Sequence, residues 1–373
     1  MNFGPAHYVP ALKIKRGEKQ ALRSLSASTV SAVTPLLEIV QIPEPAPDQA
    51  PKTLDLHLNT AFKDLGTAVQ AFSRYFLDVH EIENTGEAGA RKAFTHAARL
   101  TTPFTPVTGI SRVSDVLPAI KAMKHGLALR LTRKEFEEGL IPTKLPAFLA
   151  KHGLVPSGID LIMDIGCVDQ MVPPGIADLV RQFVGDVPTP LEWRTFTVLG
   201  CAFPKSMAVL GSDTHKLVDR SEWLAWRDHV YPTRRSLPRL PTFGDCAIQR
   251  PEGVEGFNPR FMQVSAAVRY ALDSQWLLIK GHSTDTTRSV VQFPRLGRQL
   301  VTGPLKAYFA GQKHCNGCLG IVQAAQGAPK MGSAEIWRRF GTIHHITNTV
   351  GQIQALGRAL SRRRTSEAIS STV

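Results

Sequence analysis

The sequence of 373 residues lacks most of the features that mark secreted or membrane proteins. Its 5 cysteines are few, odd in number and mostly scattered, so a disulfide framework is not expected. No run of about 18 apolar residues occurs, which excludes a membrane-spanning helix. The first residues, MNFGPAHYVPALKIKRGE, lack the basic-then-apolar order of a secretory signal. We therefore expect a cytoplasmic protein that does not enter a membrane.

Several catalytic and nucleic-acid-binding motifs are also absent. The sequence contains no Gly-rich phosphate loop, no G-x-S-x-G nucleophile motif and no H-E-x-x-H zinc helix. Helix-turn-helix, zinc-finger and RNP signatures are missing too. The function must therefore be sought in the placement of charged residues.

The charge is unevenly distributed along the chain. Apolar residues make up 43% of the sequence and charged residues 20%, which is enough for a real hydrophobic core. The formal net charge is +13; residues 1–200 are nearly balanced, whereas residues 201–373 contain 17 Arg and 6 Lys against 11 acidic residues. Clustered positive charge is typical of proteins that bind phosphate, acidic lipid or an acidic partner.

Short β-like runs recur along the chain, with helical stretches between them. Their starts lie on average about 33 residues apart, the spacing of strand-plus-crossover-helix units. This pattern predicts an α/β fold with a (β/α)8 TIM-barrel-like domain over residues 1–285. Residues 286–373 predict a basic, mainly helical C-terminal extension with a flexible tail from about 361. The runs are Tyr8–Ile14, Thr34–Val40, Tyr75–Ile82, Phe104–Ile110, Leu127–Thr132, Ile159–Gly166, Arg194–Phe203 and Thr242–Ile248.

Charged residues alternate with aliphatic ones inside several runs. In LALRL, Arg130 lies opposite Leu129 and Leu131, and LIMDI repeats the pattern with Asp164. Strands of a parallel barrel turn one face to the helices and the other to the lumen, so we expect these charges at the C-terminal mouth, where active sites lie. This barrel-mouth group comprises Lys13, Lys15, Glu18, Glu38, Asp78, His80, Arg130, Asp164 and Asp245.

Two interpretations of the barrel-mouth group remain open. In a functional pocket, the cations contact an anion and two of the carboxylates do general acid and base work. Alternatively, the charges form a neutralised network of ion pairs that fixes strand register, because buried charges must be paired whatever their role. The ligand-binding candidates are Lys13, Lys15, Glu18, His80 and Arg130, and the catalytic candidates are Glu38, Asp78, Asp164 and Asp245.

A carboxylate pair also fits glycoside hydrolysis. A barrel-type phosphodiesterase would need a second histidine besides His80 on a later strand, and that partner is missing. A hydrolase acting on a phosphorylated or glycosylated substrate is therefore an alternative function, and whether the protein is an enzyme stays open.

The segment HCNGC contains the Cys-x-x-Cys pair Cys315 and Cys318. With His344 they form a zinc candidate, since two Cys and one or two His can hold zinc tetrahedrally. The 26 residues from Cys318 to His344 exceed the spacing of compact finger motifs. The alternative is a Gly-containing turn with two small buried thiols, so no cofactor is expected unless zinc binds here.

The FGD element of the eighth run offers a further candidate. Gly244 lets the backbone approach a ligand that Asp245 could orient, and the last loops of barrels often form a phosphate site. Arg269 and Lys280 follow as ligand-binding candidates. A tight turn in which Asp245 caps the following segment fits equally well.

Arg dominates the basic half of the chain, and Arg is the better phosphate ligand. Interleaved aromatic residues such as Trp223 could stack on bases. Trp337, Arg338, His344 and His345 are the ligand-binding candidates of this half. The alternative is a solvated surface that keeps the protein soluble or contacts an acidic partner.

Motifs along residues 8–350 resemble the protein beta family, named for the beta protein of satellite phages and also found in bacterial genomes. Two positions depart from the family pattern: FLDVHEI has one aspartate where the family has several, and Cys246 stands where an aromatic residue is more usual. The matching elements are YVPALKIKRGE, PLLEI, Asp78, LALRL, IDLIMDIG, FGDCAI, VRY, WLLIKG and WRRFGTIHHIT.

The resemblance implies a component of a phage-defence or exclusion system, in some cases as part of a toxin–antitoxin-like set on a prophage or satellite. Its partners would be other proteins of the defence locus. Together with the barrel mouth, it predicts recognition of a polar or anionic ligand, such as a phosphorylated small molecule. The alternatives are the hydrolase and a nucleic-acid-binding protein that uses the Arg-rich half.

Overall fold

The computed structural model of the chain describes residues 2–45, 49–207, 210–251, 265–283 and 289–370. Within these ranges the side chains are described except at 289–290 and 359–370. None of the helices in the described part of the chain is both long enough and apolar enough for a membrane span.

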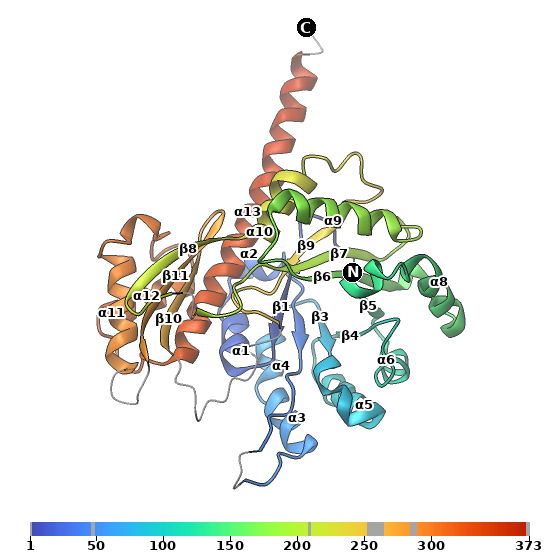
Figure 1. Cartoon of the computed structure of the whole chain (residues 1–373), viewed down its shortest axis with the longest axis horizontal. Helices are drawn as coiled ribbons and strands as arrows, with labels where there is room; N and C mark the ends of the chain where they lie inside the picture. The colour runs from blue at the N-terminus through green and yellow to red at the C-terminus, as the bar shows by residue number, and fades with distance from the viewer. Residues whose placement is uncertain (1, 46–48, 208–209, 252–264, 284–288, 371–373) are drawn as a thin grey trace.

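Eight parallel strands close into a barrel in the order β1-β2-β3-β4-β5-β6-β7-β9, which confirms the predicted TIM-barrel-like fold (Figure 1). Each predicted run overlaps one barrel strand. The strands are β1 Tyr8–Lys13, β2 Leu36–Glu38, β3 Tyr75–Asp78, β4 Phe104–Thr108, β5 Leu127–Thr132, β6 Ile159–Cys167, β7 Thr195–Cys201 and β9 Thr242–Asp245.

Helices connect the barrel strands and cover them from outside. Local sequence signals set their ends: Thr132 and Glu135 form a capping box at the start of one helix, and the Ser26 hydroxyl caps another. The helices are α1 Arg16–Arg23, α2 Ala27–Val30, α3 Leu54–Phe62, α4 Leu65–Val69, α5 Gly86–Ala98, α6 Val116–Ala122, α7 Arg133–Glu137, α8 Ile141–His152, α9 Pro173–Asp186 and α10 Ser221–Leu224.

Short single-turn elements complete the barrel connections. A 3-10 helix, His80–Thr85, follows β3, and another, Pro156–Gly158, precedes β6. A π-helical segment, Ala225–Val230, continues α10.

A second, antiparallel sheet lies beside the barrel, in the order β10-β11-β8 (Figure 1). It consists of β8 Thr214–Asp219, β10 Ser265–Ala271 and β11 Gln275–Ser283. The sheet packs against α11 Ser289–Val301, α12 Asn316–Ala325 and α13 Ala334–Ser370, with a 3-10 helix at Lys306–Tyr308.

Helix α13 runs between the second sheet and the barrel (Figure 1). Ile346, Val350 and Ile353 join the barrel core, whereas Trp337 and Phe340 join the core of the second sheet. The last barrel strand ends at Asp245, and the two faces of β10 and β11 join different cores. Ala271, Trp276 and Leu278 belong to the barrel core, whereas Ala266, Val268, Tyr270, Leu277 and Ile279 belong to the second core. The side chains of the tail predicted from about 361 lie outside the described residues, so its flexibility stays a prediction.

Candidate functional site

The strand register gathers charged side chains at the C-terminal mouth of the barrel. Lys13 pairs with Glu38 across β1 and β2, and Glu38 pairs with Asp78 across β2 and β3. Paired residues of parallel neighbours point to the same face, so all three enter the lumen together. Arg130 and Asp164 reach the same level from β5 and β6.

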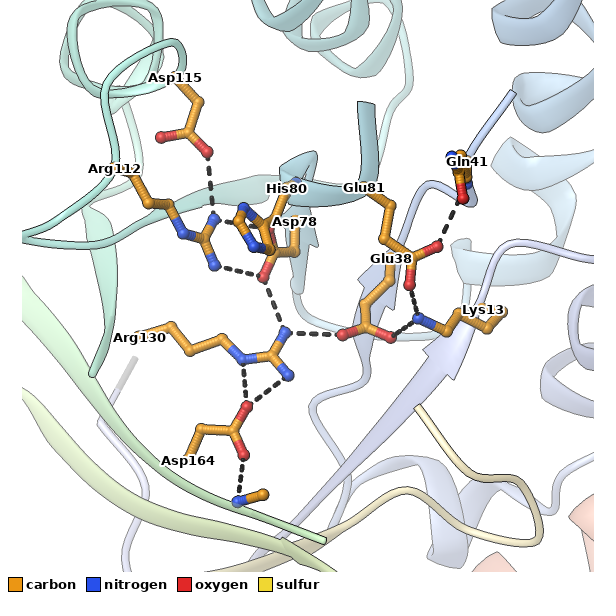
Figure 2. Close-up of polar contacts among 11 residues, drawn as sticks. Lys13, Glu38, Gln41, Asp78, His80, Glu81, Arg112, Asp115, Arg130 and Asp164 are labelled. Atoms are coloured by element: carbon orange, nitrogen blue, oxygen red, sulfur yellow. Dashed lines mark hydrogen bonds and ion pairs between the residues drawn. The ribbon is translucent and has the colours of Figure 1, made fainter. Parts of the chain in front are cut away.

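Arg130 lies at the centre of this group and binds three carboxylates (Figure 2). Its Nη1 donates to Glu38 at 2.6 Å and to Asp78 at 2.9 Å. Its Nε and Nη2 reach Asp164 Oδ2 at 2.8 and 2.6 Å. The backbone N–H of Gly166 donates to the other Asp164 oxygen at 2.9 Å. A monodentate lysine could not span these partners.

A second arginine, Arg112, also binds the Asp78 carboxylate, and sequence reasoning missed it. Arg112, in the loop after β4, donates to both Asp78 oxygens at 2.7 and 3.0 Å. It also contacts Asp115 at 3.1 Å, and Thr108 donates to that carboxylate at 2.6 Å. Periodicity gave no signal for Arg112 and Asp115, because both follow the end of a strand.

Two of the mouth carboxylates, Glu38 and Asp78, are held in their ionised form. Burial alone would raise the pKa of Asp78, but the guanidinium groups of Arg112 and Arg130 outweigh it and hold the pKa far below its usual value. Burial of Glu38 is likewise outweighed by Arg130 and Lys13, which lower its pKa. A general acid needs a raised pKa. The ion-pair interpretation therefore fits these two residues better than proton donation.

A separate ionic cluster forms the floor of the lumen. Asp160, at the start of β6, accepts hydrogen bonds from Arg74 at 3.0 Å, Arg194 at 3.1 Å and Thr195 at 2.7 Å. Asp160 is fully buried. Because it lies at the N-terminal end of the barrel, this cluster stabilises the closed sheet and does not face a ligand site.

A deep cleft opens beside the mouth network, between the ends of β1, β2 and β3 and the segment after β9. Its volume is about 1220 Å³. Lys13 connects the two sites, because its ammonium binds Glu38 at 2.9 Å on the lumen side and Glu81 on the cleft side. The cationic lining residues are Lys13, Lys15, Arg16, Lys19, Lys52, Lys63 and Arg250, and the acidic ones are Asp64, Glu81 and Glu83.

Some of these cationic side chains already have hydrogen-bond or ion-pair partners within the described part of the protein, whereas others do not. Lys19 donates to the carbonyls of Thr60, Ala61 and Lys63 at the end of α3, and Arg250 pairs with Asp169 at 2.8 Å. Within the described ranges, the side chains of Lys15, Lys52 and Lys63 make no ion pair or hydrogen bond. The cleft therefore presents positive charge that has no partner among these residues.

Lys15, at the N-cap of α1, lines the cleft and lies near three further predicted ligand-binding residues, which are Glu18 of α1, Arg269 of β10 and Arg338 of α13. Desolvation and the nearby charges of Arg338 and Lys13 lower the pKa of Lys15. Burial and Arg338 lower the pKa of Arg269 to about 10. Glu18 is the nearby counter-charge; Gln249 donates to one of its oxygens, and the other has no partner among the described residues.

The family model described as Beta protein matches residues 8–351. The chain belongs to the beta protein family. Comparison with curated proteins and with solved structures found no match. The family membership that the motifs predicted is thus confirmed over nearly the whole chain.

In this member of the beta protein family, Asp245 does not lie in the mouth. It pairs with Pro10, which is on the opposite face of β1 from Lys13, so its side chain points out of the barrel toward α13. There it accepts hydrogen bonds from Tyr8 and from His345 Nε2, the latter at 2.9 Å. The prediction that Asp245 belongs to the barrel-mouth group is wrong.

The outward side of β9 also holds two buried charged residues that sequence reasoning did not single out. Arg220 donates to Thr349 and Gln352 of α13, both at 2.9 Å. Burial and the charge of Asp245 raise the pKa of Glu222 to about 8, and together they outweigh Arg220 and nearby backbone N–H groups, which lower it. Glu222 is therefore mostly protonated at neutral pH.

Several other predicted ligand-binding residues lie away from the cleft or in the core. Lys280 is on β11, where it donates to the carbonyl of Leu210 at 2.8 Å. Trp337 is only 3% exposed and donates to Met331, so it offers no stacking surface. A Cβ on Gly244 would lie 2.8 Å from the Val9 carbonyl, so this glycine serves close strand packing. None of the three lines the cleft.

His80 lines the cleft, but it is exposed and lies 3.3 Å from Glu83.

The cysteines of HCNGC lie beside His344, with Cys318 Sγ 3.2 Å and Cys315 Sγ 3.9 Å from its Nδ1. The fold therefore brings His344 next to the two cysteines although they are far apart in the sequence. His344 and His345 lie next to each other on α13 but contact different partners.

Proposed function

We propose that the chain recognises an anionic, phosphate-bearing small molecule in the basic cleft beside the barrel mouth. The observation that carries the proposal is the surplus of cations over acids in the lining, with Lys15, Lys52 and Lys63 unpaired within the described ranges. A cleft of about 1220 Å³ accommodates a nucleotide-sized ligand. Unpaired ammonium groups bind phosphate with charge-assisted hydrogen bonds.

The mouth network supports this proposal by fixing the cleft wall. Glu38 and Glu81 hold the Lys13 ammonium between lumen and cleft, and Gln41 donates from its backbone to Glu81 at 3.2 Å. These contacts anchor the loops after β2 and β3. In this scheme Arg130 positions the carboxylates, and Lys15 and its neighbours contact the ligand.

Binding of ATP and inorganic pyrophosphate to the purified chain, measured by isothermal titration calorimetry at two salt concentrations, tests the proposal. We expect Lys15→Glu and Lys52→Glu each to weaken binding by about tenfold, and added salt to weaken it further. Lys121→Glu is the matched control, because it makes the same charge change on exposed helix α6. Equal affinities of all three variants would contradict the proposal, as would failure of both probes to bind.

The family membership supports placing this recognition in a phage-defence or exclusion system with partner proteins. The test is plaque formation on cells that carry the locus with either wild-type or Lys15→Glu protein. Loss of protection in Lys15→Glu but not in Lys121→Glu is the expected result. Lys13 and Arg130 are poor probes, since both are buried in ion pairs that support the fold.

A further inference from the structure

The N-terminus of α12 brings two thiols to the side of α13. Cys315 is the capping residue of α12, and its sulfur accepts a hydrogen bond from the backbone of Cys318 at 3.4 Å. The Cys-x-x-Cys spacing therefore places both sulfurs on the helix end that faces His344. Cys318 and His344 are buried, whereas Cys315 is partly accessible.

The orientation of the His344 ring is fixed from its other side. Its Nε2 lies 2.7 Å from the Ala271 carbonyl, which can only accept, so Nε2 carries the proton. Nδ1 then presents a lone pair toward the two sulfurs. Histidines that bind metal ions use this second-shell contact to a carbonyl. Tyr270 stacks on the ring at 3.8 Å and reaches Cys318 Sγ at 3.4 Å, which limits ring rotation.

The distances from His344 Nδ1 to the two sulfurs fit a tetrahedral zinc ion. Zinc bonds to sulfur and to imidazole nitrogen place those two atoms about 3.6 Å apart at a tetrahedral angle. The two observed nitrogen–sulfur distances are 3.2 and 3.9 Å. A second histidine, His314, has a ligand atom within 4.8 Å of Cys315 and His344. It is exposed, so its ring is free to turn toward an ion.

We infer that Cys315, Cys318, His344 and His314 bind one zinc ion. Two thiolates and two imidazoles form a closed set of four protein ligands, which is typical of structural and not catalytic zinc. The ion would join α12 to α13 and, through Ala271, to β10. Zinc would thus stabilise the packing of the second sheet against α12 and α13, and it would not take part in ligand binding at the cleft.

Metal analysis of the full chain tests this inference. The protein is purified through a Strep tag, which avoids nickel resin, and kept reduced. We expect about one zinc ion per chain by plasma mass spectrometry. Cys315→Ser, Cys318→Ser and His344→Gln should each lower the zinc content at least about tenfold. Cys167→Ser is the matched control, because this cysteine lies at the end of β6, and it should retain zinc.

Cobalt substitution gives a readout that does not depend on the folding of a variant. Wild-type protein loaded with Co²⁺ should show sulfur-to-cobalt charge-transfer absorption and the intense visible bands of tetrahedral cobalt. His314→Ala should change the visible bands while keeping the charge-transfer absorption, because both thiolates remain. Metal-free reduced protein that takes up neither Zn²⁺ nor Co²⁺ overturns the inference, as does a Cys167→Ser variant that loses the metal.

Discussion

His345 of α13 donates a hydrogen bond to Asp245 of β9 at 2.9 Å, and both side chains are almost fully buried. The hydroxyl of Tyr8 donates to the other oxygen of the same carboxylate. Burial would raise the pKa of Asp245, but His345 and Arg220 outweigh it and lower the pKa. The first strand, the last barrel strand and the last helix thus meet at one ionised group.

The first prediction is that His345→Ala lowers the free energy of unfolding by about 3–5 kcal/mol, because it removes one partner of a buried charge. Urea denaturation followed by circular dichroism measures the change. His80→Ala is the control, since its contact with Glu83 is exposed and should contribute less than about 1 kcal/mol. Similar losses in the two variants would show that the Asp245 contact does not stabilise the fold.

The second prediction concerns pH. Folding raises the pKa of Glu222 to about 8 from an ordinary value of 4.5, so the folded state holds this proton more tightly than the unfolded state. The stability that this bound proton contributes is fully present below the unfolded-state pKa of 4.5. It is lost as the pH rises toward the folded-state pKa of about 8. Glu222→Gln cannot ionise, so its stability should fall less than that of wild type between about pH 5 and pH 8. Parallel urea-unfolding profiles for both proteins would rule out the raised pKa.

The third prediction is that Arg130→Met destabilises the barrel strongly, because Glu38, Asp78 and Asp164 lose a shared partner. We expect a loss of about 3–5 kcal/mol in chemical denaturation. Arg133→Met on α7 is the control, because its partner Glu137 is exposed, and it should lose less than about 1 kcal/mol. Adding Asp78→Asn to Arg130→Met should recover part of the loss, and no recovery would argue against direct coupling.

The fourth prediction compares two glycines of α13. A Cβ at Gly341 would lie 2.7 Å from the Arg269 carbonyl of β10, whereas a Cβ at Gly351 meets nothing within 4 Å. Gly341→Ala should therefore lower the melting temperature, although Ala favours helices. Gly351→Ala should stabilise the protein by about 0.5–1 kcal/mol, because only the propensity term applies. Differential scanning fluorimetry of both variants checks the signs, and a stabilised Gly341→Ala would contradict the close packing.

Strand alternation predicted the mouth residues that lie within strands. Arg130 opposes aliphatic neighbours in LALRL, and the same rule located Asp164 and Asp78 correctly in the lumen. It also contained the signal that Asp245 faces outward, because Asp245 shares a face with the apolar Phe243. That signal was missed because the FGD element was interpreted as part of a ligand site at the barrel mouth.

Other parts of the fold and site could not be predicted from periodicity. Arg112 lies in a loop after a strand, where no alternation fixes the direction of a side chain. The pairing of Arg74 with Asp160 joins residues 86 positions apart, and only the closed barrel brings them together. Strand β8 pairs with β11, which is distant in sequence, and β10 forms an antiparallel hairpin with β11, so neither strand is part of a repeating strand–helix unit.

The junction at Asp245 also bears on how the chain folds during synthesis. Tyr8 and His345 lie far apart in the sequence, so their common partner Asp245 cannot be fully satisfied until α13 has left the ribosome. Contacts of such long range form slowly and leave earlier intermediates exposed. We therefore expect nascent barrels of this protein to stay accessible to proteases and chaperones until α13 has been made.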